Sequence, residues 1–233
     1  MIRTSRRMVA GVTMAVALAG PVDAEAQVFD MTLGALRVGV LELDSPAGSE
    51  GQSARLSIRS AGLAGLVRAV RFEAHTTGTN PRRYEEEADT GRRVSQVRID
   101  WLAGRPQVLD YAAIPSETAA PPDAAATEGT LDPVSAVTAV LAETGADRAC
   151  TLTFRLFDGQ RLSQFVLTKR QDRPDEVLCS GTFTRLAGYR PEEMAERRQF
   201  DLRLTYRRSE TGALIAVEAE VQTLYGKVRL KRR

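Results

Sequence analysis

Residues 199–207 read QFDLRLTYR, a run in which apolar and polar side chains alternate without a break. The apolar members are Phe200, Leu202, Leu204 and Tyr206. Because successive side chains of a β-strand point to opposite faces, this run predicts a strand with one buried and one solvated face. Two-faced strands of this kind are typical of antiparallel sheets, since the strands of parallel sheets are buried on both faces.

The same alternation recurs along the chain, at residues 53–59, 69–74, 151–156 and 215–222. Asp158-Gly159 separates two apolar runs, which is a short-range signal for a hairpin turn. We therefore predict an all-β, mainly antiparallel fold of about ten to twelve strands. The sheet should curl into a barrel-like structure or a wrapped sandwich.

The alternation slips by one residue within 36–43 and again within 94–101. A slip of this kind predicts a β-bulge, an extra residue that bends the strand. Such bends allow a long meander to curl toward closure. The pattern leaves open whether the interior of the curled sheet is filled by its own side chains or is hollow.

One segment departs from the strand pattern. Residues 115–130 (PSETAAPPDAAATEGT) contain few large apolar side chains, so we expect a mobile loop that can be deleted without loss of the fold. Asp132 and Pro133 should then start a helix, because Asp is a favoured N-cap and Pro suits the first helical position. An apolar stripe follows, and Gly145 can stop the helix. We predict a single amphipathic helix over residues 133–144.

The N-terminus has the features of a secretory signal peptide over residues 1–26. Arginines precede an uncharged stretch from Met8 to Gly20, and Ala24-Glu25-Ala26 offers a small-x-small site for cleavage after Ala26. The uncharged stretch is shorter than the about 20 apolar residues of a spanning helix, which disfavours a retained membrane anchor. The pair Arg6-Arg7 leaves both Sec and twin-arginine export open.

After cleavage, residues 27–233 should form a single β-rich domain in the periplasm that is not an integral membrane protein. The chain has 32 basic and 30 acidic residues and a net charge of +2, which gives no electrostatic reason to expect nucleic acid. Basic residues gather at 227–233, where Val228 and Leu230 alternate with them. This end predicts a last strand with one solvated face rather than a membrane-binding patch.

The two cysteines, Cys150 and Cys179, lie far apart in the sequence, unlike the C-x-x-C pair of redox proteins. In an oxidising compartment, a widely spaced pair is expected to form a structural disulfide. Two buried free thiols are the alternative. We predict a Cys150–Cys179 disulfide between strands that are adjacent or face each other.

The residues of common catalytic sites are missing. His75 is the only histidine, so the usual multi-histidine zinc site cannot form. No signature marks partners for a Ser-His-Asp triad, and no Gly-rich phosphate loop or calcium loop occurs. The acidic run 85–87 beside Arg82-Arg83 suggests an exposed sheet edge rather than two facing carboxylates of a glycosidase. We therefore predict no enzyme activity, no metal site and no cofactor.

Three elements in this order resemble a known bacterial family. They are Leu131-Asp132-Pro133-Val134-Ser135-Ala136, then Cys150 ahead of Phe157-Asp158-Gly159-Gln160-Arg161, then Cys179-Ser180-Gly181-Thr182-Phe183 with Ala187-Gly188-Tyr189. The chain is similar, from about Val28 to its end, to the family catalogued as domain of unknown function 3108, in its alphaproteobacterial form. It departs from that family at residues 160–163, where relatives tend to have two arginines and an aromatic residue. The resemblance implies a periplasmic β-rich domain without an established activity.

The sequence supports three hypotheses for function. The first is a non-catalytic periplasmic binding or envelope-maintenance protein that holds an apolar small molecule inside the curled sheet. The second is a structural module that binds another envelope protein through an edge strand or a loop. An envelope hydrolase is a third and less favoured alternative, because no catalytic constellation is evident.

Overall fold

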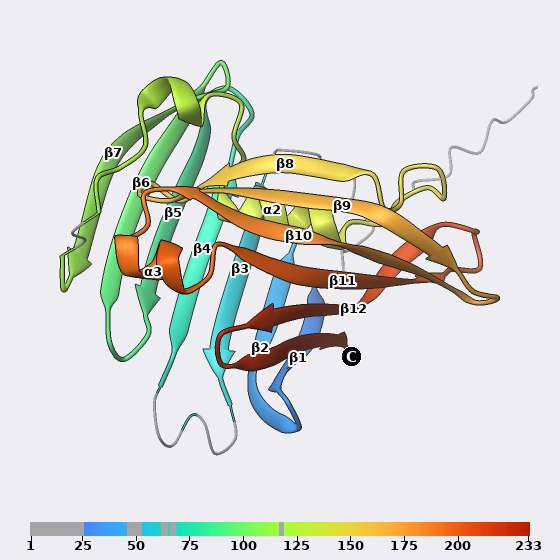
Figure 1. Cartoon of the computed structure of the whole chain (residues 1–233). Helices are drawn as coiled ribbons and strands as arrows, with labels where there is room; N and C mark the ends of the chain where they lie inside the picture. Colours follow the sequence, from blue (N-terminus) through green and yellow to red (C-terminus); the bar gives the residue numbers. More distant parts are fainter. Residues whose placement is uncertain (1–25, 46–52, 62–64, 66–68, 117–118) are drawn as a thin grey trace, which may run out of the picture.

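The computed structural model describes residues 26–45, 53–61, 65, 69–116 and 119–233, and within them thirteen strands form one antiparallel sheet (Figure 1). The first seven are β1 (Gln27–Leu33), β2 (Leu36–Asp44), β3 (Ser53–Ser60), β4 (Arg71–Thr77), β5 (Arg82–Asp89), β6 (Val94–Leu102) and β7 (Arg105–Ile114). The other six are β8 (Leu152–Phe157), β9 (Leu162–Asp172), β10 (Glu176–Ala187), β11 (Gln199–Arg208), β12 (Leu214–Thr223) and β13 (Gly226–Arg232). The described parts of the chain also contain the 3-10 helix η1 (Ala124–Thr127), α2 (Pro133–Leu141) and α3 (Pro191–Glu196).

The strand order is β7-β6-β5-β4-β3-β2-β1-β13-β12-β11-β10-β9-β8. The chain therefore starts in the middle of the sheet and runs outward to the edge strand β7. It then crosses through η1 and α2 to the other edge, β8, and returns inward to place β13 beside β1. The all-β, antiparallel prediction is confirmed. The sheet is curled rather than closed, because no ladder among the described residues joins β7 to β8.

Of the two bulges predicted from the sequence, the one within 36–43 is present and the one within 94–101 is not. In β2, Val38 is the extra residue, since Met31 pairs with Gly39 and Thr32 with Arg37. The slip predicted within 94–101 is wrong, because β6 alternates regularly from Val97 and the extra residue, Leu109, lies on its partner β7. The prediction counted Val94 as part of the apolar face, but Val94 is 49% exposed at the end of its strand. Its position in the alternation therefore does not indicate which face is buried.

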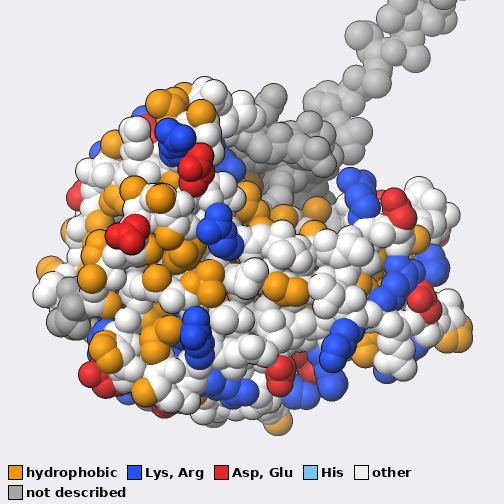
Figure 2. Space-filling view, turned by 45° about the horizontal axis from the view of Figure 1, so that its top comes forward, with side chains coloured by type: hydrophobic (Ala, Val, Ile, Leu, Met, Phe, Trp, Pro, Cys, Tyr) orange, Lys and Arg blue, Asp and Glu red, His pale blue; other side chains and the backbone are white. Residues whose placement is uncertain are grey.

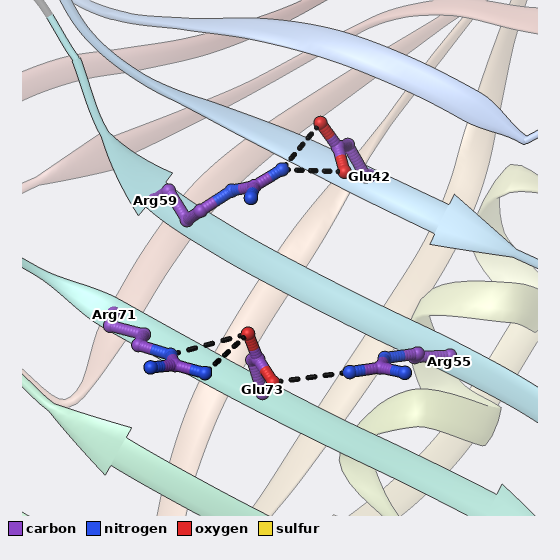
Figure 3. Close-up of polar contacts among 5 residues, drawn as sticks. All are labelled: Glu42, Arg55, Arg59, Arg71 and Glu73. Atoms are coloured by element: carbon purple, nitrogen blue, oxygen red, sulfur yellow. Dashed lines mark hydrogen bonds and ion pairs between the residues drawn. The ribbon is translucent and has the colours of Figure 1, made fainter.

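The two faces of the sheet differ as the alternation requires. The inner face carries the core, whose largest fully buried side chains are Trp101, Tyr84, Tyr206, Phe29, Leu43 and Ile99. The outer face carries cross-strand ion pairs (Figure 3). Arg59 of β3 pairs with Glu42 of β2, and Glu73 of β4 lies between Arg71 and Arg55. Exposed pairs of this kind add little stability, but they keep this face solvated.

Helix α2 lies inside the curl, where it contacts β3, β4, β8 and β12 (Figure 1). Asp132 is its N-cap and accepts a hydrogen bond from Ser135 N at 2.8 Å, with Pro133 at the first helical position. The helix ends at Leu141, three residues before the predicted end at 144. The reason is tertiary: Thr144 leaves the helix to form two backbone hydrogen bonds with Leu214, at 2.9 and 3.0 Å.

The segment expected to be a mobile loop, residues 115–130, packs against the sheet over its described part. It includes η1, and Thr127 and Thr130 are each 3% exposed. Gly129 N donates to Gly104 O in the β6–β7 turn at 2.8 Å, and Leu131, which directly follows the segment, donates from its N to Arg155 O of β8 at 2.9 Å. The described part of the segment is therefore held against the sheet by backbone hydrogen bonds rather than by apolar side chains, and its dispensability stays a prediction.

A substitution of Arg155 in β8 tests whether this segment is packed against the sheet. Its guanidinium donates to Ala126 O at 2.9 Å and to Glu128 O at 2.7 Å. We expect Arg155→Ala to lower the free energy of unfolding by roughly 2 kcal/mol, as for hydrogen bonds from a charged donor. Limited proteolysis should cleave the variant faster within 119–130. The exposed Arg203→Ala serves as control, and equal cleavage rates for both variants would contradict the packed segment.

Candidate functional site

The inner face of the curl is hollow on one side. A narrow cavity of about 260 Å³ lies between α2 and the sheet, with almost wholly apolar walls. Its walls include Val137 and Val140 of α2, Phe154 of β8, Phe165 of β9, Leu202 of β11, Ala219 and Val221 of β12, and Leu230 of β13. The rings of Phe154 and Phe165 stack with centroids 4.9 Å apart and form one side of it. Tyr206 holds the end of α2 over this cavity, with its Oη donating to Val140 O at 3.4 Å.

A second, wider cavity of about 690 Å³ opens beside the first. Its apolar walls are Leu33, Val38, Phe183, Phe200, Val221, Leu224, Tyr225 and Val228. Val221 lines both cavities, and Phe183 stands opposite Phe165 in the β9–β10 register. The two cavities therefore follow each other along the same strands, and we call them together the groove.

Small side chains on β12 and β13 leave room for the groove, whose other walls include rings such as Phe154 and Phe165. The inner positions of β12 and β13 hold Ala219, Val221 and Val228, all of them partly exposed. The opposite part of the curl, around Tyr84 and Trp101, is filled by large rings with centroids 6.4 Å apart. The interior is thus packed on one side and hollow on the other, which answers the question that the alternation left open.

Charged groups gather at the wide end of the groove. The guanidinium groups of Arg161 and Arg185 lie 5.5 and 5.1 Å from the centre of the Tyr189 ring. Arg185 also lies 4.9 Å from the centre of the Phe200 ring. Such contacts hold a cation over an apolar surface at little cost in hydration. Burial raises the pKa of Tyr189, whose Oη shares a hydrogen bond with Ser163 Oγ at 2.5 Å.

Arg185 comes from the inner face of β10 and is half-buried. Its Nη1 donates to the backbone carbonyl oxygens of Glu193 and Arg197, which join α3 to the sheet. Within the described ranges it forms no ion pair, and its Nε and Nη2 have no hydrogen-bond partner. The groove thus contains a positive charge that no carboxylate of the described residues neutralises directly.

Two acidic residues also line the wide end. Asp158 Oδ1 accepts hydrogen bonds from the backbone N–H groups of Gln160 and Arg161, at 3.0 and 2.6 Å, and shapes the β8–β9 turn. Burial raises the pKa of Asp158 despite these bonds. Burial acts in the same direction on Glu193, but the hydrogen bond from Arg190 N and the charges of Arg161 and Arg190 hold the pKa of Glu193 below its ordinary value.

A third carboxyl, that of Glu86, is buried near Asp158. Glu86 accepts hydrogen bonds from Tyr84 Oη and from Ser95 Oγ, and burial raises its pKa. Two buried carboxyls with raised pKa values are a common feature of acid–base sites. Glu86 lines neither cavity of the groove, however, and Asp158 is bonded to its own turn. The two carboxyls therefore do not both face the groove: Asp158 lines its wide end, and Glu86 does not.

Of the residues predicted from the sequence, Pro133 lines the narrow cavity, and the others lie away from the groove. Cys150 and Cys179 form a disulfide with a Cα–Cα distance of 5.1 Å, and both are buried. His75 is on the outer face, with Nε2 3.2 Å from Glu85 Oε2. Ala26 is exposed before β1, and residues 1–25 of the expected signal peptide lie outside the described residues, so cleavage stays a prediction.

The sequence reasoning missed Arg185, although a signal was present. Along β10, Val177, Cys179 and Phe183 occupy inner positions, and Arg185 continues the same alternation. A charged residue at an inward-facing, otherwise apolar position of a strand indicates a functional site. Burying its charge has a desolvation cost that apolar packing does not offset. Among the described residues no group of three His, Cys, Asp or Glu side chains is placed to hold a metal, and no helix has the length and apolar character needed to cross a membrane.

No protein-family model matches the sequence, and no curated protein matches it. A solved structure is similar, the crystal structure of a beta-barrel-like protein of domain of unknown function DUF1849 from Brucella abortus. It is 13% identical, with a TM-score of 0.49, and the match covers 89% of this chain and 95% of that chain. The resemblance to domain of unknown function 3108 stays a prediction.

Proposed function

We propose that this chain is a non-catalytic periplasmic protein that binds an apolar, chain-like molecule in the groove. The observation that carries the proposal is the pair of adjoining cavities, of which the inner one is almost wholly apolar. Pockets for small molecules span about 300–1,000 Å³, a range that includes the wider cavity. Export is supported by the N-terminal sequence and by the disulfide.

The gain in free energy comes from removing apolar surface from water on both sides. Each methylene buried in the groove contributes about 0.8 kcal/mol. Wall residues that are partly exposed in the unliganded groove, such as Phe154, Phe165 and Val221, are covered at the same time. A flexible chain suits two cavities in series better than a rigid ring does, because it can follow the line of the strands.

Val221→Trp tests the proposal, because Val221 lies where the two cavities meet. The indole should fill the groove and weaken binding of the neutral fluorophore N-phenyl-1-naphthylamine by about tenfold or more. Fluorescence titration of the purified protein measures this effect, and native mass spectrometry shows whether the protein carries a molecule from the cell. Thermal melts report whether the variant folds.

The matched control is Gln222→Trp, the next residue of β12, which faces the outer side with Lys227 as its register partner. It adds the same ring to the same strand and should leave probe binding unchanged. Equal loss of binding in both variants, or no saturable binding to the unaltered protein, would contradict the proposal.

A second candidate function, a structural interaction module, is favoured by the edge strand β7. Val108, Leu109 and Ile114 of this strand are 44%, 52% and 78% exposed. Figure 2 shows hydrophobic side chains gathering on the left of the molecule, the side on which Figure 1 places β7 and η1. Exposed apolar patches often mark interfaces, but the bulge at Leu109 interrupts the edge on which a partner strand would pair. If the groove binds no apolar molecule, the structural interaction module becomes the favoured function.

A further inference from the structure

We propose that the groove selects amphiphiles with an acidic head group, either a carboxylate or a phosphate, and that Arg185 binds this head group. The inference rests on the proposed function, since it places an apolar chain in the groove. It adds which end of that chain is charged and where the charge lies. Arg161 stands beside Arg185 at the same wide end and assists it.

The first argument is the state of Arg185. A guanidinium has five N–H donors, and two of those of Arg185, both on Nη1, are used by the carbonyl oxygens of Glu193 and Arg197. The remaining edge, formed by Nε and Nη2, matches the two oxygens of a carboxylate or phosphate. The guanidinium of Arg185 lies against the rings of Tyr189 and Phe200, which restrict its motion. Less conformational entropy of the Arg185 side chain is therefore lost when an anion binds.

The second argument is the electrostatic balance around it. The two carboxylates at this end of the groove have other partners: Asp158 accepts two backbone N–H bonds, and Glu193 caps α3 through Arg190. Glu193 also faces Arg161, so Arg161 is partly balanced by it. Arg185 shares this cavity with both carboxylates but forms an ion pair with neither of them among the described residues. A half-buried cation in an apolar cavity favours an anion, because water solvates it less well there.

The third argument is the order of the features along the groove. The charged end is the wide cavity, whose mouth is open, whereas the narrow cavity beneath α2 has apolar walls. An amphiphile bound with its chain beneath α2 therefore places its head group beside Arg185. The reverse orientation would bury the head group in the narrow cavity, whose exposed walls are almost wholly apolar although Arg203 and Glu220 also line it.

The test compares four probes by titration calorimetry on the purified full chain: dodecanoate, dodecyl phosphate, dodecanol and inorganic phosphate. We expect both acids to bind about tenfold or more tightly than dodecanol, the effect of charge-assisted hydrogen bonds in a partly buried site. The preference should fall as salt concentration rises. Inorganic phosphate alone should bind far more weakly than dodecyl phosphate, because the chain supplies most of the affinity.

Arg185→Gln should bring the ratio of the acid and alcohol affinities close to one, while the affinity for dodecanol stays the same. Arg185→Lys should keep part of the preference. The matched control is Arg197→Gln: Arg197 stacks on the same Phe200 ring, at 5.3 Å, but does not line the cavity. This variant should keep the full ratio. Because the ratio is measured within each variant, a general loss of stability does not imitate the loss of preference.

The outcomes separate this inference from the proposed function. Equal affinities for acids and alcohol in the unaltered protein would overturn the inference and leave the apolar groove in place. A preference that survives Arg185→Gln would overturn the role of Arg185. Phosphate that binds as tightly as dodecyl phosphate would replace the proposal with a simple anion site. No binding of any chain would overturn the proposed function as well.

Discussion

Asp132→Ala should lower the free energy of unfolding by about 3–5 kcal/mol, the cost of breaking a buried ion pair by removing one partner. Asp132 is fully buried, and its Oδ2 lies 2.9 Å from Arg82 Nε. It also accepts bonds from Ser135 N and Ser135 Oγ, at 2.8 and 2.6 Å. The substitution therefore removes the cap of α2 and leaves the Arg82 charge without its carboxylate. Urea unfolding followed by circular dichroism measures the effect.

The neighbouring pair on the outer face is a matched control. Arg83, next to Arg82 in β5, forms two short bonds with Asp100 of β6, at 2.8 and 2.9 Å, but the Arg83 side chain is 48% exposed. We expect Asp100→Ala to cost less than about 1 kcal/mol, as for exposed pairs. Asp132→Asn, which keeps a capping oxygen without the charge, should fall between the two. An Asp132→Ala cost no larger than that of Asp100→Ala would contradict the importance of burial here.

Removing the disulfide should have an effect of similar size. Cys150 and Cys179 are separated by 29 positions, and closing a loop of this length stabilises a domain by roughly 3–4 kcal/mol in the chain-entropy model. We expect the Cys150→Ala, Cys179→Ala double variant to lose about this much stability in urea. Both sites are buried, so part of the loss will come from missing sulfur contacts.

A reducing agent separates the covalent effect from the packing effect. It should destabilise the unaltered protein and leave the double variant unchanged. Thiol labelling of the unfolded, unreduced protein should find no reactive cysteine. Two labelled cysteines, or a variant as stable as the oxidised protein, would rule out a stabilising bridge.

The sheet could be predicted from the sequence because the alternation of apolar and polar residues within each strand indicates which face of that strand is buried. The run at 199–207 became β11, with Phe200, Leu202, Leu204 and Tyr206 all buried. The helix start at Asp132 and Pro133 was also local, since capping depends on side chains within one turn. Its end was not, because the bridge between Thr144 and Leu214 decides it.

The order in residues 119–131 could not be read from composition. The partners of Arg155 and Gln160 in this segment are backbone carbonyl oxygens, of Ala126, Glu128 and Ala119. Every residue has a backbone carbonyl oxygen, so these hydrogen bonds cannot be predicted from the side chains of the segment. The groove was hidden for a different reason: it depends on side-chain sizes across the curl, and pairing across a curl is set by the whole sheet.

The two edges of the sheet, β7 and β8, are not joined by strand hydrogen bonds among the described residues. A closed barrel would have to break a whole ladder of strand hydrogen bonds to part its wall. Here the two edges are connected through the 119–131 segment and the turn at Gly159, which lies against the side chains of Val97, Ile99 and Tyr111. The line between the two edges is therefore held by these contacts rather than by a ladder of strand hydrogen bonds, and no strand pairing of the described sheet depends on them.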